Sequence, residues 1–370
     1  MKPENDIKSG KNMKSENHMK LRNSKSRKIF RMSGVLASVL AALLLFSGCG
    51  ESAMVQKQVN SMGTIFTITA YGKKAEQGIT GAEASILAVE QMSDPDLETS
   101  VCYKLNHSQG EQVNVSGQIA EMLLDAKDIY EKTEGAYDLT VYQLVKRWGF
   151  TDGRYYVPTA DEIAAELACL CMDQVSITQF ANSGSYAVTM PSYGQLSFAS
   201  CARGCASKYA VDALKKNGVE SAIISLSGNV QTLGNKPDGT QWSVGITDPL
   251  NPSGYLGVIS VGETAVVTTG AYQEYMTGST KYHHIFNTKT GYPTQNTLLS
   301  ATVVCEDGTV ADCLSTAMYA LGYNKAISYW RQYGGFDMIL ITEDGEIVCT
   351  SGLLERFDIR NNNYTLKYVE

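Results

Sequence analysis

A carboxylate and a hydroxyl stand four residues apart in the segment 309–321, as Asp312 and Thr316. The apolar periodicity of this segment predicts an amphipathic helix, and residues four apart on a helix share one face. Carboxylate and hydroxyl oxygens are hard ligands of the kind that Mg²⁺ prefers, with water and phosphate completing its shell. The alternative is structural: an Asp in the first turn complements the helix dipole, and a Thr can hydrogen-bond to a preceding carbonyl.

Two of the four histidines are adjacent, His283 and His284, just ahead of a Thr-Gly-Tyr-Pro segment at 290–293. The pattern predicts the end of a strand followed by a turn, and neighbouring side chains on a strand point in opposite directions. Only one of the two imidazoles can therefore face a given cleft, where it could move a proton. The other interpretation is that both are structural.

Two further segments combine glycine with polar groups. Residues 225–239, SLSGNVQTLGNKPDG, could bring backbone amides near a phosphate, although they lack the spacing of a phosphate-binding loop. Residues 134–150 place Tyr137 and Asp138 shortly after Gly135, ahead of an apolar strip. The competing interpretation of the second segment is a helix that ends at Gly135 with core residues after it.

The elements that must position these groups mix helices and strands without a regular βαβ order. A helix should begin at Thr159, whose capping-box partner is Glu162, and hairpins are expected at 175–190 and at the Asp-Gly of 344–345. Frequent hairpins indicate an α+β protein with packed helices on a largely antiparallel sheet. The other expected helices lie at 74–92, 117–132, 204–217, 309–321 and 324–334, and the other strands at 58–72, 220–229, 241–249, 257–269 and 298–307.

The N-terminal segment predicts export. Residues 1–31 carry ten Lys and Arg against three acidic residues, and an apolar run from Gly34 to Phe46 follows. Such a run is typical of a secretory signal and too short for a stable membrane-spanning helix. Phe-Ser-Gly-Cys at 46–49 resembles a bacterial lipobox, so we expect a lipidated Cys49 that anchors the protein to the extracytoplasmic face of the cell membrane. Ordinary secretion or a retained anchor is the alternative. The expected division is a lipoprotein signal peptide at 1–48, a short tether at 49–59 and one folded domain at 60–370.

The net charge argues against a nucleic-acid partner, and the cysteine spacing argues against a zinc site or a disulfide framework. Loss of residues 1–48 removes ten positive and three negative charges and moves the formal net charge from −7 to −14. An acidic domain repels phosphate backbones, so we expect no nucleic-acid partner. The nine cysteines are scattered, mostly in apolar runs, and Cys201 and Cys205 are one helical turn apart. We expect buried thiols here rather than a zinc site or a disulfide framework.

Seven segments together resemble one family, the ApbE-type FAD:protein FMN transferases. The first four segments resemble its Met-Gly-Thr, Ser-Arg-Leu-Asn, Gly-x-Phe-Asp-x-Thr-Val and Asn-Leu-Gly-Gly-Asn motifs. The last three resemble its Thr-Ser-Gly-x-Tyr, His-Ile-x-Asp-Pro-x-Thr-Gly-x-Pro and Ala-Asp-x-x-Ser-Thr motifs. The segments are SMGTIFTITAYG (61–72), YKLNHS (103–108), TEGAYDLTVYQLVKRWGF (133–150), SLSGNVQTLG (225–234), VVTTGAYQEYM (266–276), YHHIFNTKTGYP (282–293) and VADCLSTAMYALG (310–322).

The resemblance implies a single T-fold-like domain and a role for each matching position. His284, with Asp138, would assist proton movement, while His283 occupies a variable position. Mg²⁺ would be held by Asp312, Thr316 and the backbone carbonyl of Ser200. The residues implied to contact FAD are Met62, Ala136, Tyr137, Asp138, Ser197, Arg203, Thr269 and Ile285.

The implied reaction is Mg²⁺-dependent transfer of FMN from FAD to a threonine of another protein, with release of AMP. That acceptor would be an extracytoplasmic flavoprotein subunit of a membrane electron-transfer system. Two alternatives are an FAD pyrophosphatase that yields FMN and AMP, and a non-catalytic, lipid-anchored flavin-binding protein. Five positions depart from the family pattern, and we expect them to affect turnover more than flavin binding. At these positions Ser197, Arg203, Cys205, Lys208 and Asn287 replace Asp, Lys, Tyr, Asp and Asp.

Overall fold

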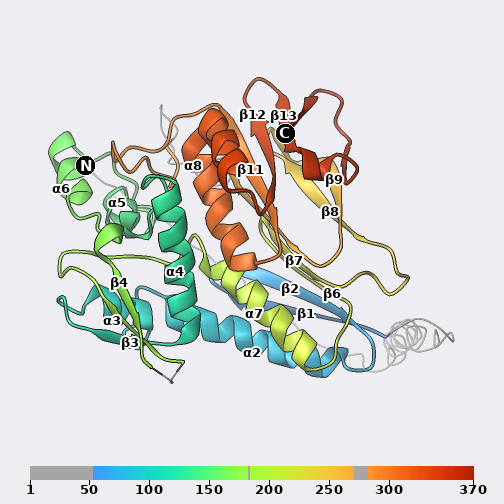
Figure 1. Ribbon diagram of the computed structural model, residues 1–370, viewed down its shortest axis with the longest axis horizontal. Coiled ribbons are helices and arrows are strands. Elements are labelled where there is room, and N and C mark those ends of the chain that lie inside the picture. The colour runs from blue at the N-terminus through green and yellow to red at the C-terminus, as the bar shows by residue number, and fades with distance from the viewer. Residues whose placement is uncertain (1–52, 182–183, 271–281) are drawn as a thin grey trace, which may run out of the picture. The chain divides into compact units, whose positions relative to one another are not determined.

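The computed structural model describes residues 53–181, 184–270 and 282–370, and a nine-stranded sheet is the largest element of this part of the chain (Figure 1). The strand order is β1-β2-β6-β7-β10-β11-β12-β13-β15, and each neighbouring pair is antiparallel except β13 with β15. These strands are β1 Met54–Ser61, β2 Thr64–Tyr71, β6 Ala222–Leu226, β7 Asn229–Leu233, β10 Ala265–Gly270, β11 Leu298–Cys305, β12 Asp337–Thr342, β13 Glu346–Thr350 and β15 Thr365–Val369.

Two small sheets and a set of helices complete the described elements. One small sheet has the order β14-β9-β8 (β14 Phe357–Ile359, β9 Asn251–Val261, β8 Trp242–Asp248), and the other has the order β3-β5-β4 (β3 Val113–Val115, β5 Tyr186–Thr189, β4 Ser176–Gln179). The α-helices are α2 Ala75–Ser93, α3 Val101–Asn106, α4 Gly117–Lys132, α5 Tyr142–Arg147, α6 Ala160–Leu167, α7 Ala202–Lys216 and α8 Gly308–Tyr333. The short 3₁₀ helices are η1 Leu139–Val141, η2 Met172–Gln174 and η4 Ser351–Leu353.

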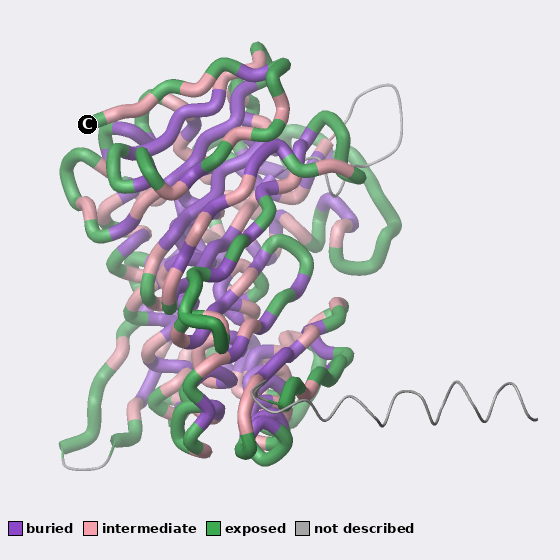
Figure 2. The backbone as a smooth tube through the Cα atoms, turned by 90° about the vertical axis from the view of Figure 1, so that its right-hand side faces the viewer, coloured by how far each residue is buried: buried purple, intermediate pink, exposed green. Residues whose placement is uncertain are grey.

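The large sheet is covered on both faces because its strands alternate two apolar sets. Val267 and Val303 belong to the core that the sheet shares with α2, α4, α7 and α8, which lie in front of the strands in Figure 1. Their neighbours Val266 and Val304 belong to the core shared with the β14-β9-β8 sheet. Successive side chains of a strand point to opposite faces, so this alternation sets which face receives the helices. Buried backbone accordingly concentrates in the interior strands and helices (Figure 2).

The α+β class and the largely antiparallel sheet are confirmed, as are the helices expected at 74–92, 117–132 and 204–217. The capping box of Thr159 and Glu162 is formed, and the 175–190 hairpin is present, with its tip residues 182–183 outside the described part. Residues 58–72 are not one strand: β1 and β2 form a hairpin. Met62 and Gly63, at its turn, have φ of 49° and 69°. Two successive positive φ values favour a two-residue hairpin turn, which the alternating pattern concealed.

The expected strand at 257–269 is also two strands, β9 and β10, in different sheets. The helices expected at 309–321 and 324–334 are the two halves of α8, which bends at Gly322 where φ is 73°. Cys49, the signal peptide, residues 49–52 of the expected tether and residues 271–276 of the VVTTGAYQEYM segment lie outside the described residues. The rest of the expected tether is not a linker, because residues 54–59 belong to β1 and pair with β2.

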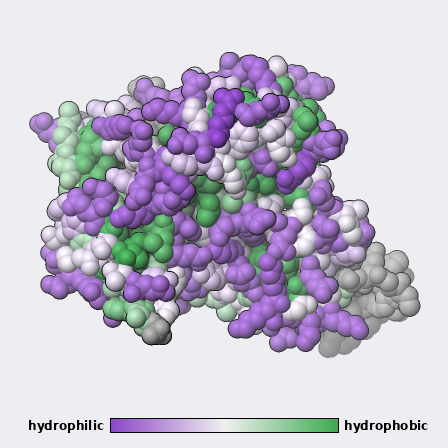
Figure 3. All heavy atoms as spheres, in the orientation of Figure 1, coloured by the Kyte–Doolittle hydropathy of each residue, from purple (hydrophilic) through white to green (hydrophobic). Residues whose placement is uncertain are grey.

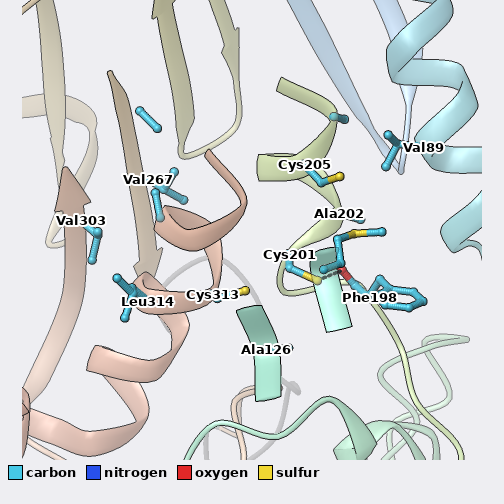
Figure 4. Packing of buried hydrophobic residues seen from close by; sticks show 14 of the residues in the cluster. Val89, Ala126, Phe198, Cys201, Ala202, Cys205, Val267, Val303, Cys313 and Leu314 are labelled. Carbon is cyan, nitrogen blue, oxygen red and sulfur yellow. Dashed lines mark hydrogen bonds between the residues drawn. The ribbon is translucent and has the colours of Figure 1, made fainter. Parts of the chain in front are cut away.

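The cysteines of the described part are free thiols, and those near the N-termini of α7 and α8 are buried. Cys201, Cys205 and Cys313 lie in the helix-side core with Phe198 and Leu314 (Figure 4). Within the described ranges, no helix has both the length and the apolar character needed to cross a bilayer. Hydrophilic residues predominate on the face of the molecule seen in Figure 3, with separate hydrophobic patches between them.

The N-terminal turns of α7 and α8 make an unusually close contact. A Cβ on Gly204 would lie 2.0 Å from the carbonyl oxygen of Gly308 and 2.6 Å from Cβ of Asp312. The backbone N–H of Gly204 donates a hydrogen bond of 2.8 Å to Oδ2 of Asp312. Glycine is therefore required at position 204 by the approach of two backbones.

We predict that Gly204→Ala destabilises the protein by about 1 to 3 kcal/mol, because the added methyl must push the two helices apart. Urea unfolding followed by circular dichroism measures the effect. Gly117→Ala is a matched control, since a Cβ at this helical glycine would meet nothing nearer than the Gly184 carbonyl at 3.8 Å. Equal stabilities of the Gly204 and Gly117 variants would contradict the close-contact argument.

Candidate functional site

A cavity of about 430 Å³ brings together nearly all the residues singled out from the sequence. It lies against the ends of β7 and β10, the N-terminal parts of α7 and α8, and the loop after α4. Met62 is not among its lining residues; it lies at the β1–β2 turn, partly buried against the main core. The predicted residues that do line the cavity are Ala136, Tyr137, Asp138, Ser197, Ser200, Arg203, Thr269, His284, Ile285, Asp312 and Thr316.

Hard oxygen donors cluster where α8 meets β10. Oγ1 of Thr269 lies 2.8 Å from Oγ of Ser315 and 3.3 Å from Oγ1 of Thr316. Asp312, one turn before Thr316, contributes a carboxylate that is only 9% exposed. The segment thus places a carboxylate and a set of hydroxyls from two elements in one corner of the cavity.

Asp312 does not cap its own helix, contrary to the structural alternative considered above. Asp307 is the N-cap of α8 and accepts from the N–H groups of Thr309 and Val310, whereas Asp312 lies beyond the first turn. The carboxylate instead accepts from Gly204 in the first turn of α7, so it caps a different helix. Pairing between helices cannot be deduced from spacing within one of them.

The electrostatics of Asp312 fit a cation. Burial raises the pKa of Asp312 to about 7, although the Gly204 N–H and the charge of Arg203 oppose the rise. The described residues contain no group of three or more His, Cys, Asp and Glu side chains that could hold a metal. One carboxylate among hydroxyls and carbonyls is a donor set suited to Mg²⁺ that keeps water and phosphate oxygens in its shell. The residues present therefore fit a Mg²⁺–phosphate site.

The loop after α4 forms another wall. The OH group of Tyr137 lies 3.0 Å from Oγ of Ser200, which ties this loop to the segment that precedes α7. Oδ1 of Asp138 accepts hydrogen bonds of 2.6 Å from the backbone N–H and the hydroxyl of Thr140. Burial nevertheless raises the pKa of Asp138 to about 6. A carboxyl group with a pKa near neutrality can accept and return a proton.

The two histidines have different roles in the structure. His283 is buried: its Nε2 lies 2.9 Å from the Thr294 carbonyl oxygen, and the Ile285 N–H donates to its Nδ1 at 3.2 Å. The imidazole thus carries its proton on Nε2, and burial lowers its pKa to about 4. His284 lines the cavity, with its ring 6.2 Å from that of Phe150. The expectation that only one of the pair faces a cleft is confirmed.

The turn after the histidines is fixed by the segment 133–150. Nε1–H of Trp148 donates to the Gly291 carbonyl at 3.1 Å, and Oγ1 of Thr288 donates to the Gly135 carbonyl at 2.7 Å. A Cβ on Gly291, where φ is 70°, would lie 2.3 Å from Ile163. The segment 133–150 and Ile163 therefore fix the turn that follows the histidines.

Only two of the five departures from the family pattern line the cavity, Ser197 and Arg203. Ser197 Oγ accepts from the Ala199 N–H at 3.2 Å, so it supports the local turn as a carboxylate would. Lys208 bridges Glu121 and Asp307. The remaining two are Cys205, which is buried in the core, and Asn287, whose Oδ1 accepts from the N–H groups of Lys289 and Thr290.

The structure adds cavity residues that the sequence did not single out individually. Ser227, Gly228 and Asn229 come from the glycine-rich segment, and Tyr142 and Phe150 come from the segment 134–150. Nδ2 of Asn229 is buried and has no hydrogen-bond partner among the described residues. An unpaired buried donor is costly, so this amide is suited to a bound acceptor oxygen. In the sequence, only the glycine-rich pattern of residues 225–239 indicated that this segment could line a binding site.

A buried carboxylate, a hydroxyl cluster, a guanidinium and a facing histidine define an enzyme-type site for an anionic ligand. Comparison with known proteins specifies the class. The model of the ApbE family matches residues 62–340, and the chain belongs to this family. The FAD:protein FMN transferase of Treponema pallidum is 27% identical over 363 residues, covering 93% of this chain and 99% of that protein. An FAD:protein FMN transferase from Klebsiella pneumoniae is 30% identical over 263 residues, covering 70% of this chain and 80% of that protein.

Solved structures agree on the fold. The crystal structure of the ApbE protein from Thermotoga maritima has a TM-score of 0.75 at 25% identity and covers 84% of this chain and 100% of that one. The apo form of the flavinyl transferase ApbE from Pseudomonas stutzeri also has a TM-score of 0.75, at 24% identity, with 85% and 100% covered. The single ApbE-type domain expected from the sequence is confirmed.

We predict that a substitution at His283 lowers stability, whereas one at His284 lowers activity. His283→Asn should lower the free energy of unfolding by about 1 to 3 kcal/mol near neutral pH, because it loses a buried hydrogen bond. His284→Asn should change stability by less than about 0.5 kcal/mol but reduce the rate of any reaction in the cavity. Denaturant unfolding and activity per folded molecule separate the two effects.

The His283 effect should depend on pH. Its folded pKa of about 4 is below the ordinary 6.5, so folding favours the neutral ring and this stabilisation is lost as pH falls from 6.5 toward 4. The difference between wild type and His283→Asn should therefore shrink by about 2 kcal/mol between about pH 7.5 and about pH 5. A difference that is constant over this range would show that His283 is not held neutral.

Proposed function

We propose that this protein is a Mg²⁺-dependent FAD:protein FMN transferase. It transfers the FMN half of FAD to a threonine of an extracytoplasmic flavoprotein subunit of a membrane electron-transfer system and releases AMP. The observation that carries the proposal is the juxtaposition, in one cavity, of the Asp312–Thr316–Thr269 oxygen cluster with Arg203 and His284. The named activity of the curated relatives supports the same conclusion.

The reaction exchanges the phosphoanhydride bond of FAD for a phosphoester bond to threonine. The threonine Oγ forms a bond to the phosphorus of the FMN half, the bridging P–O bond breaks, and AMP leaves with that electron pair. The threonine proton passes to a base. Asp138, with a pKa of about 6, is mostly ionised at neutral pH and can accept it, and His284 is the second candidate.

The other cavity residues hold the anionic pyrophosphate. Arg203 supplies a fixed positive charge, and Nδ2 of Asn229 supplies a buried donor. Asp312, Thr316 and the Ser200 carbonyl would hold Mg²⁺, whose contribution is to neutralise phosphate charge as it develops. Exclusion of water at the reacting phosphorus would be required, because water would otherwise replace threonine as the acceptor.

We predict that Asp312→Asn abolishes Mg²⁺-dependent FAD cleavage, with a loss on the order of a hundredfold or more. The amide oxygen can still accept from the Gly204 N–H, so the helix contact is kept while the charge is removed. Burial raises the folded pKa of Asp312 from 3.8 to about 7, so the stability that its neutral form contributes is lost as pH rises from 3.8 through about 7. Without metal, the variant should thus be at least as stable as wild type at about pH 8.

The assay incubates the protein with FAD and Mg²⁺, with and without a short synthetic peptide that contains Ser-Gly-Ala-Thr, the kind of acceptor sequence that the family resemblance implies. A fluorescent flavinyl peptide supports the transferase, free FMN indicates a pyrophosphatase, and retained FAD with neither product indicates a flavin-binding protein. An Asp312→Asn variant that keeps its Mg²⁺-dependent rate would limit Asp312 to its structural role of capping α7.

We also propose that Cys49 is lipidated and anchors the enzyme to the extracytoplasmic face of the cell membrane, where a membrane-bound acceptor would be accessible. The basic segment, the apolar run and the Phe-Ser-Gly-Cys sequence support this location. Cys49→Ala should leave an unprocessed precursor without the diacylglyceryl mass, as intact mass spectrometry of the membrane fraction would detect. A normally processed and released product would contradict the anchor.

A further inference from the structure

A second cavity, a groove of about 810 Å³, lies on the face of the large sheet opposite α7 and α8. Its floor contains alternate residues of neighbouring strands, among them Ile223 and Ser225 of β6, whereas Ile224 belongs to the helix-side core. Alternate residues of a strand share one face, so the groove is floored by the face that the helices do not cover. We call it the β8 groove.

One wall of the β8 groove is the edge of a strand. β8 pairs only with β9 in the order β14-β9-β8, so one side of its backbone has no neighbouring strand in the described part of the chain. Residues 243–247, five in succession, line the groove. Consecutive residues alternate between the two faces of a strand, so their joint presence means that the edge itself borders the cavity. Such an edge offers backbone donors and acceptors to an added strand.

Exposed apolar side chains line the groove. Tyr255 is 66% exposed. Ile65, on the opposite side, is 50% exposed. A Cβ on Gly245 would lie 2.5 Å from the ring of Tyr255, so the glycine allows this ring to lie directly on β8. Apolar surface of this kind beside an unpaired edge marks an interaction site.

The composition of the lining indicates the chemistry of the occupant. All residues found to line the groove are uncharged, and many are Ser or Thr, although the chain after residue 48 carries a formal charge of −14. A nucleotide would require cations for its phosphates, so it does not fit. An extended, uncharged peptide segment does fit, because its backbone can pair with β8 and its small side chains can contact the hydroxyls.

The β8 groove borders the cavity that contains Asp312 and His284, here called the flavin cavity. Ser227, Gly228 and Thr268 line both spaces, so the β6–β7 turn and the end of β10 form their common border. On the cavity side, the next residue of β10, Thr269, contacts Thr316 in the oxygen cluster. A residue of a peptide in the groove therefore has only to pass this turn to approach the reacting phosphate.

We propose that the β8 groove binds the threonine-bearing segment of the acceptor flavoprotein as a strand added to the edge of β8. The segment lies between Tyr255 and Ile65, and its threonine enters the flavin cavity beside Gly228. This assignment rests on the proposed transferase function and adds the location and the chemistry of the acceptor site. It also accounts for an exposed sheet edge that is neither charged nor covered among the described residues.

The test compares wild type with Tyr255→Ala and Ile65→Lys, using FAD, Mg²⁺ and the Ser-Gly-Ala-Thr peptide. We expect kcat/KM for flavinyl-peptide formation to fall on the order of tenfold or more in both variants, mainly through a higher KM for the peptide. FAD affinity and the release of FMN to water should stay within about twofold, because neither residue lines the flavin cavity. Leu354→Lys is the control, since Leu354 is 58% exposed and lines neither space.

Hydrogen exchange gives an independent readout: amides of 243–247 should exchange more slowly when the peptide is present. Unchanged peptide kinetics in both groove variants, with wild type fully active, would overturn the groove assignment and leave the proposed function intact. A wild-type protein that labels no peptide would instead overturn the proposed function and the groove assignment with it. A change of oligomeric mass in the variants without a change in KM would assign the edge to self-association and also overturn the proposal.

Discussion

The contact between the first turns of α7 and α8 is the constraint on which the rest of the site depends. Gly204 lets the two backbones meet, and its N–H is satisfied by Asp312 from the other helix. The same contact orients the Asp312 carboxylate beside Thr316 and places Arg203 at the cavity wall. Any side chain at position 204 would separate these groups, and the proposed catalysis would tolerate displacements of only a fraction of an ångström.

The cavity keeps buried groups whose charge is costly for folding. Asp312 and Asp138 both have pKa values well above the ordinary range because burial disfavours their ionised forms. A protein selected for stability alone would replace them with neutral side chains. In the proposed function, a cation at Asp312 and a transferable proton at Asp138 would compensate these charges. The curated relatives are named FAD:protein FMN transferases, so FAD is the ligand that this proposal assigns to the cavity.

The large sheet separates two spaces. On its helix side, α7, α8 and the loop after α4 line the cavity with Asp312, Arg203 and Asp138. On its other side lies the β8 groove, where one edge of β8 has no neighbouring strand among the described residues. Ser227 and Gly228, in the turn between β6 and β7, line both spaces. This turn is thus both a wall of the cavity on the helix side and the border of the β8 groove.

Much of this arrangement could be predicted from local pattern. The helix periodicities, the capping box at Thr159 and the hairpin chemistry indicated an antiparallel α+β domain, because these signals arise within a few residues. Motif order gave the family, and the adjacent histidines required that only one face a cleft. Local pattern failed at residues 58–72, where two positive φ values interrupt one alternating run, and at Asp312, which caps a neighbouring helix rather than its own.

The sequence by itself therefore determined the class of fold, the family and the types of group available for chemistry, because periodicity and motifs are properties of neighbouring residues. Only the tertiary structure decided which groups meet. Tyr137 reaches Ser200 across 63 positions, and Trp148 holds Gly291 across 143, so no local spacing contains these contacts. The roles of Asn229, of the buried His283 and of the open β8 edge likewise depend on burial and on pairing between distant strands, which form only when the whole sheet is assembled.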